Sequence, residues 1–322
     1  MDPGEISQRD RRVLLSFHRF CGRDLSVAMP LRLGEKPLSS GSGGVTSQSH
    51  DSLLPAAVDE LWKRRDELDP GDAEARGVVV GAVDLLDTGT ARVATVSGDG
   101  EVVVDRRAGR AVALAFRLLG LVRSQVGDFQ HHDRIPLKTS FDGVRVVPGA
   151  IARWGAHLAP GVVLMPSFVD IGAHVGAGTV VDTWATVGSC AQIGENVRLS
   201  GGACVGGGTE PPDGVPAVVE DDALIGGRAL IAEGARVGRG AVVGAGTILS
   251  ASTPVVDVRT GEELERGRVP DRSVAVGGTR STSLAGGAFG LPCVLVLGRL
   301  PEARRHDRSA LGEILREYGL NL

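Results

Sequence analysis

The chain repeats an aliphatic residue every six positions, and this period constrains its fold more than any other feature. The repeat runs through two blocks that share one spacing, namely Val169, Val175, Val181, Val187, Ile193, Leu199 and Val205, then Val219, Ile225, Ile231, Val237, Val243 and Leu249. An amphipathic helix would repeat its apolar residues about every 3.6 positions and a half-buried strand every second position, so neither generates this spacing. A fixed short period is typical of a β-solenoid, in which each repeat buries its apolar side only against its neighbours.

A small residue stands four positions after nearly every aliphatic one, which indicates how the solenoid turns. These small residues are Ala173, Thr179, Ala185, Ala191, Ala203, Ala223, Ala229, Ala235, Ala241 and Thr247, with Val197 as the larger exception. Six residues make one flat side of a triangular coil, with the aliphatic residue inside and the small residue near the corner. Glycine often follows the aliphatic residue and permits backbone angles that a Cβ would penalise. We therefore predict a mainly β fold, the left-handed parallel β-helix of the hexapeptide-repeat proteins.

The composition fits a thin solenoid core and argues against several classes of partner. The 322 residues include 47 glycines and only 3% aromatic residues, a shortage that a narrow core of Val, Ile and Ala explains. A net charge of −4 gives no electrostatic reason to expect nucleic acid. No apolar run reaches about 18 residues, so we predict no membrane span. The faint twin-arginine pattern at Arg11-Arg12 is broken at once by His18 and Arg19, so we expect a cytoplasmic protein.

Changes of pattern along the chain divide it into four predicted parts. Residues 1–51 contain a Gly- and Ser-rich stretch and are predicted to be a flexible extension. Residues 52–143 combine helical patterns with strand-like pieces, which predicts a small α/β domain in which residues 111–121 are either a helix or a buried strand. The coil is expected over residues 144–255. Residues 256–322 are predicted to be a strand and helix extension that ends in a terminal helix.

One break in the period predicts a loop on the coil. Val219 follows Val205 by fourteen residues instead of twelve, and the excess falls in a stretch rich in Gly and Pro. We expect a loop near residues 206–216 to bulge from one corner. Loops of this kind usually border a binding cleft.

A solenoid of this kind does not define a function, so the chemistry must come from its polar residues. A zinc site would need three converging imidazoles, and only His157 and His174 lie in the solenoid. The four cysteines form no CxxC pair, which also argues against a zinc site or a disulfide framework. We therefore predict no metal, and a carboxylate must serve as any catalytic base within the repeats. Asp182 is the most conspicuous candidate, because it stands where glycine follows the aliphatic residue in many repeats; the alternative is a solvated aspartate.

The residues around Asp182 resemble a known enzyme family. The run of fourteen residues from Val181 to Gly194, VDTWATVGSCAQIG, resembles the signature stretch of the tetrahydrodipicolinate N-succinyltransferases. Further similar segments are Leu164-Met165-Pro166-Ser167, Leu199-Ser200-Gly201-Gly202, Arg145-Val146-Val147-Pro148, Gly267-Arg268-Val269-Pro270 and Lys63-Arg64-Arg65. The similarity covers about residues 52 to 320.

The resemblance implies a homotrimer with active sites between subunits and with CoA along the coil edge. It assigns Asp182 to acceptor binding or general-base catalysis and Arg145 to a substrate carboxylate. This agrees with the chemistry of the residues, because an arginine fork suits a carboxylate and an attacking amine needs a proton acceptor. The implied co-substrate is succinyl-CoA, with acetyl-CoA as an alternative, and no tightly bound cofactor is expected.

The chain departs from the family in the expected acceptor pocket. The family commonly reads Gly-Ala-Arg-Ser-Glu where this chain has Gly226-Gly227-Arg228-Ala229-Leu230, so Leu230 replaces a glutamate thought to be catalytic. Glu233 matches a different glutamate of the family and is retained as a second catalytic candidate. Asp170 stands where the family tends to have Asn. We expect Ser167, Asp170, Trp184 and Leu230 to line the acceptor side, and Gly226, Gly244, Arg268 and Arg280 to line the CoA side.

These observations predict an acyl-CoA-dependent N-acyltransferase. The favoured reaction is N-succinylation of tetrahydrodipicolinate, in the lysine and diaminopimelate pathway, by direct attack of the amine on the thioester. No positioned Cys–His or Ser–His pair indicates an acyl-enzyme, and Cys190 is expected to pack at a corner. One alternative is a paralogue that N-succinylates or N-acetylates another small amino acid, because acylating an open amine needs less proton handling than opening a cyclic imine. A second alternative is a non-catalytic assembly protein.

Overall fold

The computed structural model describes residues 52–206, 212–301 and 308–319. The predicted flexible extension, residues 1–51, lies outside the described residues, as does part of the predicted loop. Among the described residues, no helix has both the length and the apolar character needed to cross a membrane.

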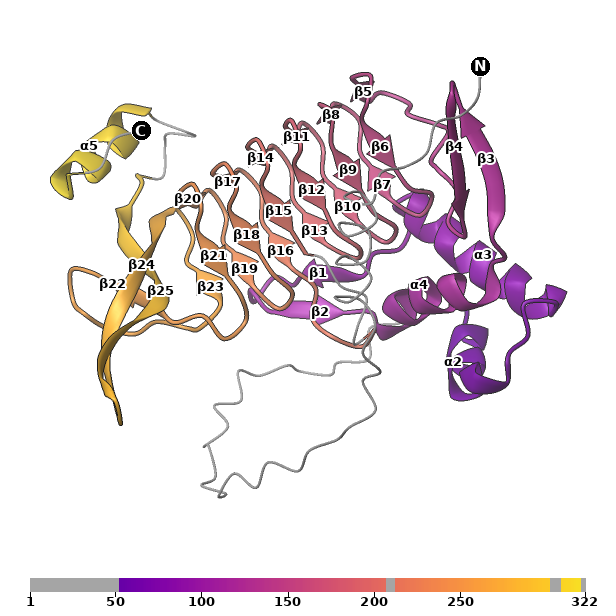
Figure 1. The fold of residues 1–322 in the computed structure, drawn as a ribbon, viewed down its shortest axis with the longest axis horizontal. Coiled ribbons are helices and arrows are strands. Elements are labelled where there is room, and N and C mark those ends of the chain that lie inside the picture. The colour runs from indigo at the N-terminus through magenta and orange to yellow at the C-terminus, as the bar shows by residue number, and fades with distance from the viewer. Residues whose placement is uncertain (1–51, 207–211, 302–307, 320–322) are drawn as a thin grey trace, which may run out of the picture. The chain divides into compact units, whose positions relative to one another are not determined.

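Three sheets of stacked parallel strands form the coil, as the period of six predicts (Figure 1). Sheet 1 contains β5 (Arg145–Val146), β8 (Val163–Leu164), β11 (Val180–Val181), β14 (Arg198–Leu199), β17 (Leu224–Ile225) and β20 (Val242–Val243). Sheet 2 contains β6 (Ile151–Ala152), β9 (Phe168–Val169), β12 (Thr186–Val187), β15 (Cys204–Val205), β18 (Leu230–Ile231) and β21 (Ile248–Leu249). Sheet 3 contains β7 (His157–Leu158), β10 (His174–Val175), β13 (Gln192–Ile193), β16 (Val218–Val219), β19 (Arg236–Val237) and β23 (Arg268–Val269).

The register of these strands explains the sequence pattern. Successive strands of one sheet pair in parallel with their aliphatic residues aligned, so that Val181 lies between Leu164 and Leu199. All three are fully buried in the core. Thr179 shows why a hydroxyl is tolerated at the small position: its Oγ1 donates to the Gly194 carbonyl at 2.9 Å and accepts from the Val197 N–H at 3.0 Å. A parallel β-helix with a Val, Ile and Ala core is therefore confirmed.

The coil continues beyond residue 255, where the sequence predicts its end. Strand β23 pairs with β19, and the first residues of β24 (Ser273–Leu284) pair with β20. Strand β22 (Val255–Asp257) lies between the coil strands β21 and β23 along the chain and pairs instead with β25 (Gly287–Arg299). An insertion thus separates two strands of the last turn, and this insertion hides the period of six. The predicted terminal helix is α5 (Arg308–Glu317), whose Leu311 and Leu315 are buried in a cluster with Leu297 of β25.

The region before the coil contains helices and two short hairpins. Its elements are α2 (Ala57–Lys63), the 3-10 helix η1 (Arg65–Glu67), α3 (Ala73–Asp87), β1 (Ala94–Val96), β2 (Val102–Val104), α4 (Arg106–Leu118), β3 (Val122–Val126) and β4 (Phe129–Asp133). Asp72 caps α3 by accepting from the Ala75 N–H, and Asp105 caps α4 by accepting from the Arg107 N–H. Residues 111–118 are thus helical, which settles the choice between a helix and a buried strand.

The helical region packs against the coil through a shared apolar cluster. Ile171 and Cys190 of the coil are buried together with Val112 and Leu114 of α4. Burial raises the pKa of the Cys190 thiol to about 11, so this cysteine is a packing residue and not a nucleophile. The described end of the predicted loop also contacts α4, where Arg110 pairs with Asp213 through two hydrogen bonds of 2.8 and 3.0 Å.

Candidate active site

Asp182 stands at the corner between sheets 1 and 2 and faces outward. Its Oδ1 accepts from the Thr183 N–H at 2.7 Å, and its Oδ2 lies 3.4 Å from Nη2 of Arg198. The side chain retains 28% of its exposure, so the carboxylate is held in place and remains accessible. Trp184 follows in the turn with a φ of 59° and a 77% exposed side chain, which is unusual for so large an apolar residue.

Two arginines flank Asp182 on the outer face of sheet 1. Arg145 on β5 aligns with Val163, and Val163 aligns with Val180, two residues before Asp182. Two strand spacings of about 4.8 Å and an offset of two residues along the strand therefore separate Arg145 from Asp182. Arg198 lies on the next strand beyond Asp182. The prediction that Arg145 and Asp182 share one site is consistent with this placement.

The sequence interpretation missed Arg198. Arg198 occupies the outward position directly before the buried Leu199. Polar residues are common at this position of the repeat, so an arginine there does not by itself indicate a site. The sequence does carry one signal, which is the distance of Arg198 from Asp182. Arg198 follows Asp182 by sixteen residues, and one full turn of the coil takes eighteen, so the two side chains meet across adjacent strands.

Gly226 and Gly244 occupy the same corner as Asp182, two and three strands further along the stack. Each directly follows the buried residue of its strand, in β17 and β20, as Asp182 does in β11. A Cβ on Gly226 would lie 2.5 Å from the Ala245 backbone nitrogen, and one on Gly244 would lie 2.9 Å from a methyl of Val276. The approach of the next turn thus explains both glycines without a ligand. Their predicted role beside CoA stays a prediction.

Leu230 and Glu233 lie on and beside sheet 2. Leu230 aligns with Cys204 and Ile248 on the outer face of this sheet. Glu233 is exposed at the corner between sheets 2 and 3. Burial raises the pKa of the Cys204 thiol, and the negative charge of the nearby Glu233 raises it further. Leu230 and Glu233 therefore share one side of the coil, but Asp182 of the same chain lies at the opposite edge of sheet 2.

Ser167 directly precedes β9 and Asp170 directly follows it, and both have constrained surroundings. The Asp170 carboxylate lies 3.1 Å from Nη1 of Arg153 and also accepts from the Ile171 N–H at 2.8 Å. Arg153 in turn pairs with Asp133 of β4, so Asp170 helps to join the hairpin to the coil. Ser167 is buried, and its hydroxyl has no hydrogen-bond partner among the described residues.

The two arginines predicted to bind CoA lie on other strands than the ones that Gly226 and Gly244 follow. Arg268 projects from sheet 3, where its strand pairs with β19. Arg280 lies on β24 and pairs with Glu263 at 2.8 Å. The four predicted CoA residues therefore do not belong to one sheet, and their common role stays a prediction. The two solenoid histidines, His157 and His174, stack on one another with ring centroids 4.6 Å apart.

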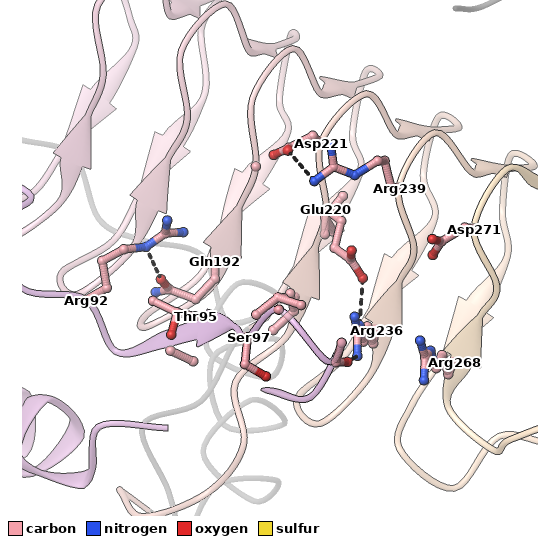
Figure 2. A pocket seen from close by; sticks show the side chains of 17 residues that line it. Arg92, Thr95, Ser97, Gln192, Glu220, Asp221, Arg236, Arg239, Arg268 and Asp271 are labelled. Atoms are coloured by element: carbon pink, nitrogen blue, oxygen red, sulfur yellow. Dashed lines mark hydrogen bonds and ion pairs between the residues drawn. The ribbon is translucent and has the colours of Figure 1, made fainter. Parts of the chain in front are cut away.

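A cleft of about 630 Å³ lies on sheet 3 (Figure 2). It is thus separate from sheet 1, which carries Arg145, and from sheet 2, which carries Leu230. The β1–β2 hairpin forms one wall, and strands β13, β16, β19 and β23 form the other. Its charged side chains include the ion pairs Arg236–Glu220, at 2.6 Å, and Arg239–Asp221, at 3.0 Å. Sequence reasoning did not indicate this cleft, because its walls come from segments about one hundred residues apart.

Comparison with known proteins supports one family over most of the chain. Residues 53–118 match the tetrahydrodipicolinate N-succinyltransferase N-terminal family, and residues 216–251 match the hexapeptide repeat of succinyl-transferase. A 2,3,4,5-tetrahydropyridine-2,6-dicarboxylate N-succinyltransferase of Paramagnetospirillum magneticum is 44% identical over 285 residues, which cover 83% of this chain and 99% of the relative. The enzyme of that name from Delftia acidovorans is 40% identical over 274 residues, covering 82% of this chain and 98% of the relative.

Proposed function

This chain belongs to the tetrahydrodipicolinate N-succinyltransferase family, and from that premise we propose that it transfers a succinyl group from succinyl-CoA to tetrahydrodipicolinate. Relatives that carry this activity in their names align over 98% or more of their own length. The observation that carries the proposal is the outward carboxylate of Asp182, held beside Arg198 on the sheet face that also presents Arg145.

The chemistry of the site fits direct acyl transfer. Water first adds across the C=N bond of the cyclic imine, so that the acceptor nitrogen carries a proton. This nitrogen attacks the thioester carbonyl, a C–N bond forms, the C–S bond breaks, and CoA leaves as its thiolate. The ring C–N bond of the hydrated carbon then breaks, the hydroxyl proton moves to the nitrogen, and a ketone remains. Asp182 accepts the proton that the nitrogen loses, and that proton can then pass to the thiolate or to water. Arg145 binds an acceptor carboxylate through its planar fork. Arg198 positions Asp182, because its guanidinium group fixes the carboxylate toward the outer face of sheet 1.

An exposed apolar face supports the proposed trimer. Ile248 and Ile151 project from the outer face of sheet 2 with 63% and 38% exposure, and Trp184 is exposed at its edge. A second copy seated on this face would cover these side chains and bring another chain's corner toward Leu230 and Glu233. Sedimentation of the purified protein tests this directly: a trimer is expected, and a monomer at assay concentration would contradict it. The cytoplasmic location stays a prediction.

Leu230 favours one second candidate function. An aliphatic side chain cannot move a proton, and opening the cyclic imine of tetrahydrodipicolinate needs more proton handling than acylating a free amine. A chain that has lost this carboxylate therefore suits an already open amine. The alternative is N-succinylation or N-acetylation of another small amino acid with the same Asp182 and Arg145.

A steady-state assay separates these functions. Thioester loss is followed with succinyl-CoA or acetyl-CoA and with either tetrahydrodipicolinate or a panel of open-chain amino acids. The primary proposal expects the highest kcat/KM for succinyl-CoA with tetrahydrodipicolinate. Turnover of an open-chain amine alone would replace it with the alternative. No amine-dependent thioester loss with either donor would favour the non-catalytic assembly protein.

A further inference from the structure

The cleft on sheet 3 has charged walls that the proposed acyl transfer does not use. Figure 2 shows Arg92 and Gln192 at one end of the cleft and Arg268 and Asp271 at the other. The hairpin residue Thr95 lines the same cleft. Because one wall belongs to the helical region and the other to the coil, a ligand in this space would contact both.

Most of the charges in the cleft are already neutralised by one another. Arg236 pairs with Glu220 and also donates to the Gly100 carbonyl of the hairpin, so both members of this pair are held and mostly buried. Arg239 pairs with Asp221, whose carboxylate also accepts from the Glu195 N–H. These pairs form the floor and rim of the cleft, but they leave no charge for a ligand.

Arg92 differs from its neighbours. Its Nε donates to Oε1 of Gln192 at 3.3 Å, and among the described residues no carboxylate lies within ion-pair distance of it. Burial lowers the pKa of its guanidinium group, and the charge of Asp221 only partly offsets this effect from a distance. An arginine nevertheless stays protonated in proteins, so Arg92 is a partly desolvated cation that has no ion-pair partner in the part of the chain that the structure describes. Its terminal Nη atoms have no hydrogen-bond partner within the described residues.

We propose that the cleft binds a small carboxylate-bearing molecule, whose carboxylate pairs with the terminal nitrogens of Arg92. The other three arginines that line the cleft pair with Glu220, Asp221 and Glu265, so among the described residues Arg92 alone of the four has no ion pair, and one carboxylate would supply it. A planar guanidinium edge also matches the two oxygens of a carboxylate. Such a ligand would clamp the β1–β2 hairpin onto strands β13 and β16.

Equilibrium binding of succinate to the full-length protein tests this assignment, with calorimetry as the readout. Wild type is expected to bind succinate saturably, and Arg92→Gln should weaken binding at least about tenfold because a charge-assisted hydrogen-bonded pair is lost. The matched control is Arg123→Gln, on the exposed strand β3, which should bind succinate as wild type does.

A second pair of variants keeps the test valid if Arg92→Gln fails to fold. Thr95 is exposed on β1 and lines the cleft, so its replacement should not disturb the core. Thr95→Asp places a carboxylate inside the cleft and should abolish succinate binding, whereas the equally sized Thr95→Asn should retain it. Loss of succinate binding in both variants would mean that the shape of the cleft, and not its charge, determines binding. This result would overturn the proposed pairing of the carboxylate with Arg92.

Three results would refute the proposal. Wild type that binds no succinate at millimolar concentration would show that the cleft holds only water. Unchanged binding in Arg92→Gln and Thr95→Asp would place the succinate elsewhere. Inorganic phosphate or CoA binding at least about tenfold tighter than succinate, and lost in Arg92→Gln, would reassign the cleft to phosphate groups. None of these results depends on whether the protein acylates tetrahydrodipicolinate.

Discussion

At the scale of single residues, the proposed reaction depends most on Asp182. Asp182→Asn removes the proton acceptor but keeps the size of the side chain and its acceptor oxygen for the Thr183 N–H. We expect kcat to fall by about 10²- to 10⁴-fold, the usual contribution of general acid–base catalysis, while the melting temperature stays nearly constant. Steady-state kinetics and thermal unfolding measure both effects. Asp66→Asn, at an exposed pair on η1, is the control, and an equal loss of activity there would refute the assignment.

Leu230 tests the consequence of a missing carboxylate. Leu230→Glu returns an acidic side chain to the outer face of sheet 2, where the residue is only partly buried and a charge can remain solvated. If the cyclic imine is the acceptor and proton handling limits turnover, kcat for tetrahydrodipicolinate should rise by about tenfold or more. Activity with open-chain amines should not rise. Leu230→Gln is the matched control of similar size, and a gain with Gln as large as with Glu would exclude a proton-transfer role.

Three residues show how far inference from single residues reaches. Asp182 could be found because it interrupts a regular pattern of glycine, and the structure places its carboxylate outside as the pattern requires. Arg198 was missed because the outward position of a repeat accepts any polar residue, so that only its distance of sixteen residues from Asp182 marks it. The sequence indicates Arg268 as a candidate but does not indicate its sheet. The insertion before β23 interrupts the period of six, so the side of the coil on which Arg268 lies cannot be counted from the repeats.

At the scale of the element, each strand of the coil stabilises its neighbours, so one core residue affects several strands. Leu199 of β14 is fully buried and lies between Val181 and Ile225. Leu199→Ala should lower the free energy of unfolding by about 2–5 kcal/mol, because the narrow interior cannot collapse around the lost methyl groups. Denaturant unfolding measures the change. Leu121→Ala, at an exposed leucine, should stay within about 0.5 kcal/mol, and equal losses would contradict a packed core.

The coil was predictable because its period is strict and the same residue types recur inside and at the corners. Its end was not, because residues between β21 and β23 leave the coil to form β22 against β25, and a period cannot be followed across an insertion of unknown length. The choice for residues 111–118 between helix and buried strand needed tertiary contacts, since a short apolar run fits both.

At the scale of the whole molecule, polar residues of sheet 3 join the helical region to the coil. His157, His174 and Gln192 align on successive strands of this sheet, and Arg92 contacts Gln192 from the helical side. His157 also lies near Asp87 and Lys138, which pair with one another at 2.7 Å. The cleft opens where this row of residues continues toward Arg236. The contact between the two regions is therefore partly electrostatic, and its strength should depend on pH.

The sign of that dependence follows from His174. Burial lowers its pKa to about 3, and the charges of Arg92 and His157 act in the same direction. In the unfolded chain a histidine titrates near about 6.5, so between these values the unfolded chain binds more protons. The contribution of His174 to stability is complete above about pH 6.5 and should fall by about 1.4 kcal/mol per pH unit as the pH drops toward 3. Urea unfolding at pH values from about 7 to 4 measures this slope.

The comparison variant for this slope is His174→Gln. Glutamine does not titrate, and Gln192 already occupies the equivalent position on the next strand in a buried state, so the substitution suits its surroundings. Acid effects of the carboxylates, such as Asp59 with its lowered pKa, are common to both proteins and cancel in the difference. The variant should lose stability less steeply than wild type between about pH 6 and 4. Parallel curves would mean that His174 becomes protonated without disturbing the contact between the helical region and the coil.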